Sequence, residues 1–133
     1  MNFVFQQQSF DPIHAALFTD LYELAMVQAY WAHRMNQPAT FEIFFRTLPE
    51  NRNFVLASGL EDVLAYLENL QFRDDDIAYL NNHAQFQDDF IEWLKSFRFA
   101  GDVYAVPEGT VVFANEPILQ IVAPRAETEL IET

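Results

Sequence analysis

The spacing of apolar residues changes along this chain of 133 residues, and that change limits the fold class more than any other feature. Between residues 60 and 94, apolar side chains recur every three or four positions, which is typical of helices. From Gly101 onward they gather in three short β-rich runs, at residues 103–106, 111–113 and 118–122. Because helices and strands do not alternate regularly, a doubly wound parallel sheet is disfavoured and an α+β domain is predicted.

An aromatic helix is predicted to follow Leu17. Its apolar residues form two stripes, one of Leu17, Leu21, Leu24 and Trp31 and another of Tyr22, Met26 and Tyr30. A helix with two apolar sides is buried on both, either deep in one core or between this domain and a partner.

Strands are predicted at residues 39–46 and 54–57, and we expect the two to pair. Helices are predicted from Leu60 to Asn69 and after each of two acidic runs, since acidic side chains favour helix starts through the macrodipole. The three runs after Gly101 predict an antiparallel β unit, with Pro107-Glu108-Gly109 as a structural hairpin. The first turns of a further helix follow Pro124.

The composition excludes several function classes. Seven Lys and Arg against 20 Asp and Glu give a formal net charge of −13, which repels nucleic acid and anionic lipid. No stretch approaches the roughly 20 apolar residues of a membrane span, and residues 1–8 lack the basic start and apolar run expected of a signal peptide. The absence of cysteine excludes disulfides and thiolate metal sites. We therefore expect a cytoplasmic protein, with residues 1–15 forming a polar N-terminal arm.

Three residues are candidates for ligand binding. Tyr22 offers a ring face on which a flat heterocycle can stack, although a tyrosine on an aromatic stripe is more commonly a core residue. Asp20 stands where an N-cap would stabilise the helix by about 1 kcal/mol, and a role beside a bound ring is the second interpretation. Arg46 can clamp a phosphate bidentately, whereas the commoner fate is pairing with a surface carboxylate.

A family resemblance connects these residues. It rests on four segments: Thr19-Asp20-Leu21-Tyr22-Glu23-Leu24, Phe41-Glu42-Ile43-Phe44-Phe45-Arg46, Val106-Pro107-Glu108-Gly109-Thr110 and Asn115-Glu116-Pro117. The chain from about Ala16 to Thr133 closely resembles the N-terminal domain of nicotinate phosphoribosyltransferases, which are type II phosphoribosyltransferases. The resemblance implies an α/β-hammerhead-like domain over residues 16–133, in which an antiparallel β unit packs against helices and the catalytic barrel is absent.

The resemblance also implies a reaction. The nitrogen of nicotinate attacks the anomeric carbon of phosphoribosyl pyrophosphate, pyrophosphate leaves, and nicotinate mononucleotide forms for NAD biosynthesis. Mg²⁺ and ATP assist in the full-length enzyme, and none is expected to bind this fragment. The resemblance further implies that, in a homodimer, Tyr22 stacks on the pyridine ring in the neighbouring subunit, Arg46 contacts phosphate groups there, and Asp20 lies beside the ring. The fragment alone carries no catalytic residue and is expected to be inactive.

Other motifs carry weaker arguments. Arg52 ranks below Arg46 as a phosphate ligand, and His14, His33 and His83 stand outside any metal or nucleophile motif. The run Asp74-Asp75-Asp76 does not converge on one centre, so no metal site is predicted. Two alternative functions remain open, namely a non-catalytic acidic interaction module derived from this fold and a relative that uses nicotinamide.

Overall fold

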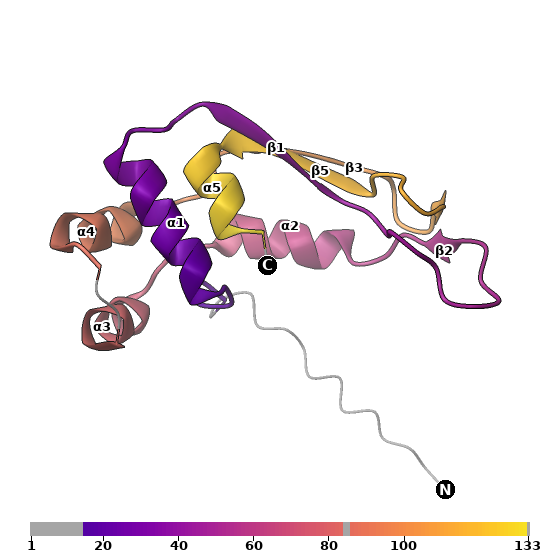
Figure 1. Cartoon of the computed structure of the whole chain (residues 1–133). Helices are drawn as coiled ribbons and strands as arrows, with labels where there is room; N and C mark the ends of the chain where they lie inside the picture. Colours follow the sequence, from indigo (N-terminus) through magenta and orange to yellow (C-terminus); the bar gives the residue numbers. More distant parts are fainter. Residues whose placement is uncertain (1–14, 84–85, 133) are drawn as a thin grey trace, which may run out of the picture.

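The computed structural model describes residues 15–83 and 86–132. Across these residues the molecule is elongated, with most helices at one end and a small β ribbon at the other (Figure 1). The helices are α1 (Leu21–Ala32), α2 (Leu60–Asn69), α3 (Asp74–His83), α4 (Asp88–Ser96) and α5 (Arg125–Leu130). The strands are β1 (Pro38–Ile43), β2 (Val55–Leu56), β3 (Asp102–Ala105), β4 (Val111–Val112) and β5 (Leu119–Pro124). The antiparallel sheets with packed helices confirm the α+β prediction.

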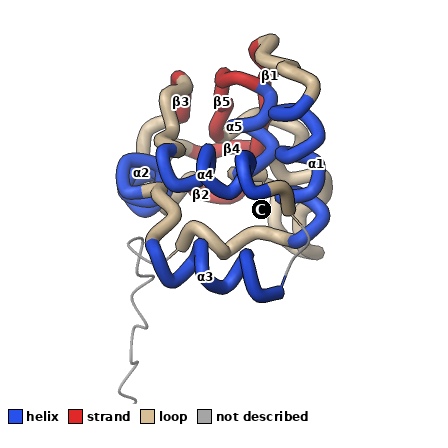
Figure 2. Tube along the Cα trace, turned by 90° about the vertical axis from the view of Figure 1, so that its left-hand side faces the viewer, coloured by secondary structure: helices blue, strands red, loops and turns tan. Residues whose placement is uncertain are grey.

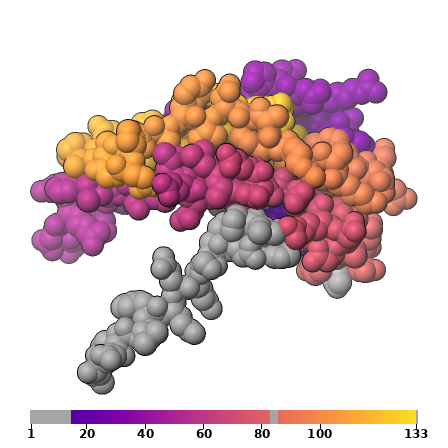
Figure 3. Space-filling model, turned by 180° about the vertical axis from the view of Figure 1, so that it is seen from behind, coloured from indigo at the N-terminus to yellow at the C-terminus, as the bar shows by residue number. Residues whose placement is uncertain are grey.

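The larger sheet is antiparallel and has the strand order β1-β5-β3, which is visible end-on in Figure 2. Its central strand, β5, alternates buried and half-buried residues, as a strand does when one face meets a core. Leu119, Ile121 and Ala123 point to the buried face, where Leu67 of α2 packs against them. Figure 3 shows α2 running along the middle of the molecule on this side. The sheet therefore rests on α2 and leads directly into α5.

The approach to β3 requires a glycine. A Cβ on Gly101 would lie 2.5 Å from the Cβ of Ala123 and 2.9 Å from the carbonyl oxygen of Val122, closer than real carbon atoms approach. The neighbours are backbone and a short buried side chain, so they cannot move aside easily. Gly101 thus allows the chain to enter the sheet beside β5.

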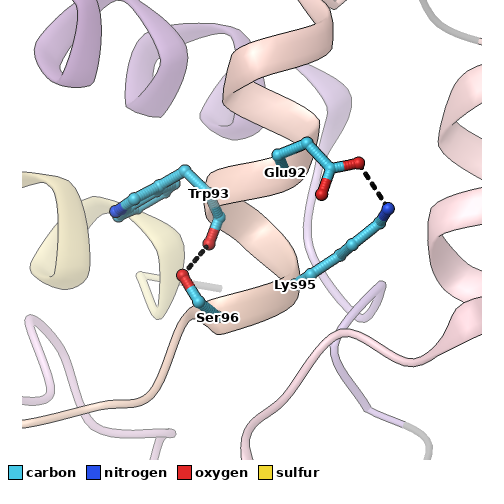
Figure 4. Close-up of polar contacts among 4 residues, drawn as sticks. All are labelled: Glu92, Trp93, Lys95 and Ser96. Atoms are coloured by element: carbon cyan, nitrogen blue, oxygen red, sulfur yellow. Dashed lines mark hydrogen bonds and ion pairs between the residues drawn. The ribbon is translucent and has the colours of Figure 1, made fainter.

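The helical body consists of α1, α3, α4 and α5, and it encloses an aromatic core. Phe90 of α4 is fully buried and stacks on Trp93, with ring centroids 5.6 Å apart and an interplanar angle of 22°. Trp31 of α1 also packs on the Phe90 ring, with ring centroids 5.7 Å apart. On the outer side of α4, Lys95 pairs with Glu92, while the Trp93 indole points the opposite way (Figure 4). The strongly amphipathic α4 thereby connects α1 to the rest of the body.

The acidic runs begin helices, as predicted. Asp74, Asp75 and Asp76 occupy the first turn of α3, and Asp88 and Asp89 that of α4. Asp76 Oδ2 accepts a hydrogen bond from the backbone N–H of Arg73 at 2.9 Å, which satisfies one donor left free by the helix start. The predicted helix after Gly59 is also confirmed, with Gly59 at a φ of 103°.

The β arm, defined as residues 44–57 and 107–117, differs from the prediction in its pairing. The predicted pairing of the strands at 39–46 and 54–57 is wrong, because β1 pairs with β5 whereas β2 pairs with β4. The first of these strands ends at Ile43, three residues earlier than expected. The expected single β unit after Gly101 is likewise divided, since β3 and β5 share one sheet and β4 belongs to the other. Strand spacing in the sequence did not reveal that crossover.

The turn at Pro107-Glu108-Gly109 is not a β-hairpin, because the strands that flank it belong to different sheets. It caps α2 instead. Glu108 Oε1 accepts hydrogen bonds from the backbone N–H groups of Gly59 at 2.9 Å and Leu60 at 2.6 Å. A carboxylate at a helix N-terminus also interacts favourably with the helix dipole. The turn therefore ties the β arm to α2.

The predicted N-terminal arm lies outside the described residues, apart from Ala15, which is buried. Among the described helices, none has the length and apolar character needed to cross a bilayer.

Candidate functional site

The start of α1 carries two of the predicted site residues. Asp20 has the extended backbone of an N-cap and forms a capping box with Glu23, which confirms its predicted place at the helix start. Glu23 Oε2 accepts a hydrogen bond from the backbone N–H of Asp20 at 2.8 Å. This interaction fixes the angle at which the chain enters the helix, and with it the position of Tyr22 two residues later.

Tyr22 is not a core residue of this domain, since 54% of its surface is exposed. The buried residues of α1 are Glu23, Leu24 and Val27, on one side of the helix. Neither predicted apolar stripe is buried along its whole length, because Leu21 of one and Tyr22 and Met26 of the other are exposed, while Leu24 and Tyr30 meet the core. The interpretation of a helix buried on both sides within one core is therefore wrong, and a partner surface is the alternative that remains.

The surroundings of Tyr22 disfavour ionisation of its phenol. Partial desolvation raises the pKa of Tyr22, and the negative charges of Glu23, Glu132 and Asp20 add to the rise. The hydroxyl donates a long hydrogen bond of 3.4 Å to Glu23 Oε1. Tyr22 thus presents a neutral, electron-rich ring face, which is suited to stacking on a flat, electron-poor heterocycle.

Arg46 lies in a loop of the β arm rather than at the end of a strand. Its neighbour Phe45 is anchored, because the Phe45 carbonyl accepts a hydrogen bond from the N–H of Asn115 at 2.7 Å. Arg46 is exposed, and within the described chain no hydrogen bond or ion pair occupies its guanidinium. The commoner fate considered for this residue, pairing with a surface carboxylate, is not observed. The side chain is available to an anion.

The domain does not bring Arg46 together with Tyr22 and Asp20. The last two lie at the start of α1, whereas the chain runs from β1 into the β arm, away from that helix start (Figure 1). Within the described residues, no hydrogen bond or ion pair joins Arg46 to Tyr22 or Asp20. Any joint action of these side chains requires surfaces that this domain does not contain.

The other polar candidates remain structural or unassigned. Arg52 is exposed in a turn where its N–H donates to the Pro49 carbonyl at 3.1 Å. His33 is the exposed C-cap of α1, His83 is the last residue of α3, and His14 lies outside the described residues. Among residues 15–83 and 86–132, no three His, Asp or Glu side chains gather as metal ligands would.

Two buried carboxylates were missed by sequence reasoning. Glu23 is 1% exposed and Glu129 of α5 is 5% exposed. Burial raises the pKa of Glu129, and the charges of Glu132 and Glu23 raise it further, against a lowering by Arg125. The spacing of Asp20 and Glu23 is a capping-box signature, so the position of Glu23 was readable, but its burial under α5 was not.

Comparisons with known proteins identify the family. Residues 17–133 match the model of the nicotinate phosphoribosyltransferase N-terminal domain. The chain is 55% identical to nicotinate phosphoribosyltransferase pncB2 of Mycobacterium tuberculosis over 118 residues, covering 89% of this chain and 26% of that protein. It is 43% identical to the nicotinate phosphoribosyltransferase of Bacillus subtilis, over 89% of this chain and 24% of that protein.

A solved structure has the same architecture. The crystal structure of human nicotinic acid phosphoribosyltransferase superposes with a TM-score of 0.76 at 36% identity, covering 86% of this chain and 24% of that one. The chain thus spans about a quarter of the length of these relatives. On the match of residues 17–133 and these identities, the chain belongs to the nicotinate phosphoribosyltransferase family, of which it carries the N-terminal domain.

Proposed function

We propose that this domain is part of a cytoplasmic, homodimeric enzyme that transfers phosphoribosyl from phosphoribosyl pyrophosphate to nicotinate. The nicotinate nitrogen bonds to the anomeric carbon, the bond from that carbon to pyrophosphate breaks, and pyrophosphate leaves with the electron pair. The products are nicotinate mononucleotide, a precursor of NAD, and pyrophosphate. The names of the relatives support the reaction, and these relatives are about four times longer than this chain.

The exposure of Tyr22 is the observation that carries the proposal. Tyr22 leaves 54% of its surface exposed, beside the exposed Asp20 and Leu21, and so has room for a second ring. Stacking on an electron-poor pyridine contributes about 0.5–1.5 kcal/mol beyond the burial of area. Tyr22 would hold the base and Asp20 would lie beside it, so that the ring nitrogen is directed at the anomeric carbon.

Arg46 is the proposed phosphate ligand. Its guanidinium can form two parallel hydrogen bonds with phosphate oxygens, and it has no competing carboxylate partner among the described residues. Because the chain carries a net charge of −13, such a site has to concentrate positive potential locally. We therefore place the phosphate groups against Arg46 and against the catalytic barrel of the other subunit.

Mg²⁺ and ATP belong to the proposal for the full-length enzyme. The described residues do not fit a metal site, since they include no group of three possible ligands. The roles proposed for Tyr22 and Arg46 involve neither the metal nor ATP.

The proposal is tested by assaying nicotinate mononucleotide formation with the full-length protein and with the chain of residues 1–133. We expect turnover by the full-length protein, a preference for nicotinate over nicotinamide, and none by the shorter chain. Turnover by the shorter chain would contradict the shared site. An inactive full-length protein would favour a non-catalytic interaction module. A preference for nicotinamide would mean that nicotinamide, and not nicotinate, is the substrate base.

A further inference from the structure

Glu23 is the most deeply buried charged residue of the described chain, with 1% of its surface exposed. It lies between Tyr22 and Leu24 in the first turn of α1, beneath the candidate base site. A buried carboxylate is destabilising unless hydrogen bonds compensate the loss of water, so its partners explain why it is tolerated.

The Glu23 carboxylate joins three residues of the α1 start. Oε2 accepts hydrogen bonds from the Thr19 hydroxyl and from the backbone N–H of Asp20, the second at 2.8 Å. Oε1 accepts one from the Tyr22 hydroxyl at 3.4 Å. One side chain thus contacts both residues proposed to hold the base, as well as the residue before them.

Helix capping alone does not explain this arrangement. Asp76 makes the same interaction at the start of α3, accepting from the backbone N–H of Arg73 at 2.9 Å, while remaining only partly buried. Glu23 performs that role in a costlier place, because it is almost fully buried and because, after burial and Glu132, its charge adds to the raised pKa of Glu129. A buried carboxylate beside a second carboxylate is destabilising, so capping alone does not account for its placement there.

We propose that Glu23 is a positioning residue for base binding, and that its carboxylate holds Asp20 and the Tyr22 ring in the orientation that receives the pyridine. The proposal rests on the function proposed above. A carboxylate offers acceptor sites on both oxygens, whereas an amide offers them on only one. Replacing Glu23 by Gln therefore keeps the shape but leaves at least one of the three donors facing an N–H₂ group.

The test is steady-state kinetics of the full-length enzyme carrying Glu23→Gln. We expect the KM for nicotinate to rise roughly tenfold, with little change in the KM for phosphoribosyl pyrophosphate. Thr19→Val, which removes one donor to the same carboxylate, is expected to act in the same direction by a smaller factor. If the Glu23→Gln variant does not fold, the KM for nicotinate of the Thr19→Val variant provides the test.

The matched control is Asp76→Asn, the same carboxylate-to-amide change at the equivalent position of α3. It is expected to lower the melting temperature to a similar extent and to leave both KM values unchanged. The proposal would be overturned if Glu23→Gln and Asp76→Asn had equal melting temperatures and neither changed the KM for nicotinate. Glu23 would then be only a helix cap.

Tyr22→Ala distinguishes a failure of the positioning role of Glu23 from a failure of the proposed base site. If it raises the KM for nicotinate while Glu23→Gln and Thr19→Val do not, only the positioning role fails. If Tyr22→Ala itself leaves the KM for nicotinate unchanged, the proposed base site fails as well.

Discussion

The helical body and the β arm both contain many aromatic residues, but the body encloses an aromatic core whereas the aromatic side chains of the arm are exposed. In the body, Phe90 is fully buried and contacts two tryptophans. In the arm, Val112 is buried but most large apolar side chains are exposed, namely Phe44, Phe45, Phe54, Leu56, Val111 and Phe113. The body completes its core from its own sequence, whereas the arm does not. Exposed apolar patches of this kind mark contact surfaces.

The backbone of the arm agrees with this contrast. β2 and β4 pair over only two residues each, and a ribbon of that length is marginal on its own. Hydrogen bonds extend the pairing to the Ala57 N–H and the Thr110 carbonyl, at 2.9 Å. Because Arg46 extends from the same arm, its position depends on what covers the aromatic residues. The proposed site therefore combines a rigid half, at α1, with a half that a partner surface would fix.

The largest expected effect separates the two regions by stability. Phe90→Ala should lower the free energy of unfolding by about 3–5 kcal/mol, because it empties a closed core. Phe113→Ala, where half of the ring is exposed, should cost less than about 1 kcal/mol. Urea unfolding monitored by tryptophan fluorescence measures both, and similar losses would contradict the division into a finished body and an unfinished arm.

Much of the body was predictable from the sequence, and much of the arm was not. Helix starts at Asp74 and Asp88 follow from local rules, because the acidic side chains and the apolar period act within one element. The pairing of β2 with β4 joins Val55 to Val112 and Leu56 to Val111, which are far apart in the sequence, and no local pattern specifies it. The same limit hid the burial of Glu23, which depends on α5 packing across α1. The roles proposed for Tyr22 and Arg46 come from the family resemblance, since residue spacing alone did not indicate them.

The second effect concerns Tyr66, which packs where the body meets the sheet. Burial raises the pKa of Tyr66 from 10.0 to about 12, with Glu23 adding to the rise. The folded state therefore holds the phenolic proton more tightly than the unfolded state. Between these two pH values, the free energy of unfolding should fall as the pH rises, by on the order of 2 kcal/mol. Tyr66→Phe should remove that part of the fall, and an unchanged pH profile in the variant would contradict the assignment.

A third effect sharpens the connection between arm and body. Glu108→Ala removes the acceptor for the N–H groups of Gly59 and Leu60 and should cost about 1 kcal/mol. Amide hydrogen exchange should quicken at the start of α2 and in the β arm but not in α4. Glu50→Ala, an exposed loop variant, serves as the control. Unaltered exchange at α2 would show that the cap does not hold the arm.

The smallest effect is a gain in stability. Glu129 is charged above its raised pKa and is disfavoured there by burial and by Glu132 and Glu23. Glu129→Gln should therefore stabilise the domain at neutral pH by less than about 1 kcal/mol, and the gain should vanish in acid, where Glu129 is protonated. Thermal unfolding across pH, with the exposed Glu68→Gln as control, measures it. A loss of stability at neutral pH would mean that the carboxylate has a favourable partner.

The central claim is that Tyr22 holds the base and Arg46 holds phosphate. The most direct measurement compares both KM values in full-length Tyr22→Ala and Arg46→Ala, with Tyr79→Ala as a control tyrosine that is also 54% exposed. We predict that Tyr22→Ala raises the KM for nicotinate by about tenfold, and that Arg46→Ala raises the KM for phosphoribosyl pyrophosphate by a similar factor. Melting temperatures should stay unchanged. Unchanged KM values in both variants, with lowered melting temperatures, would contradict the account.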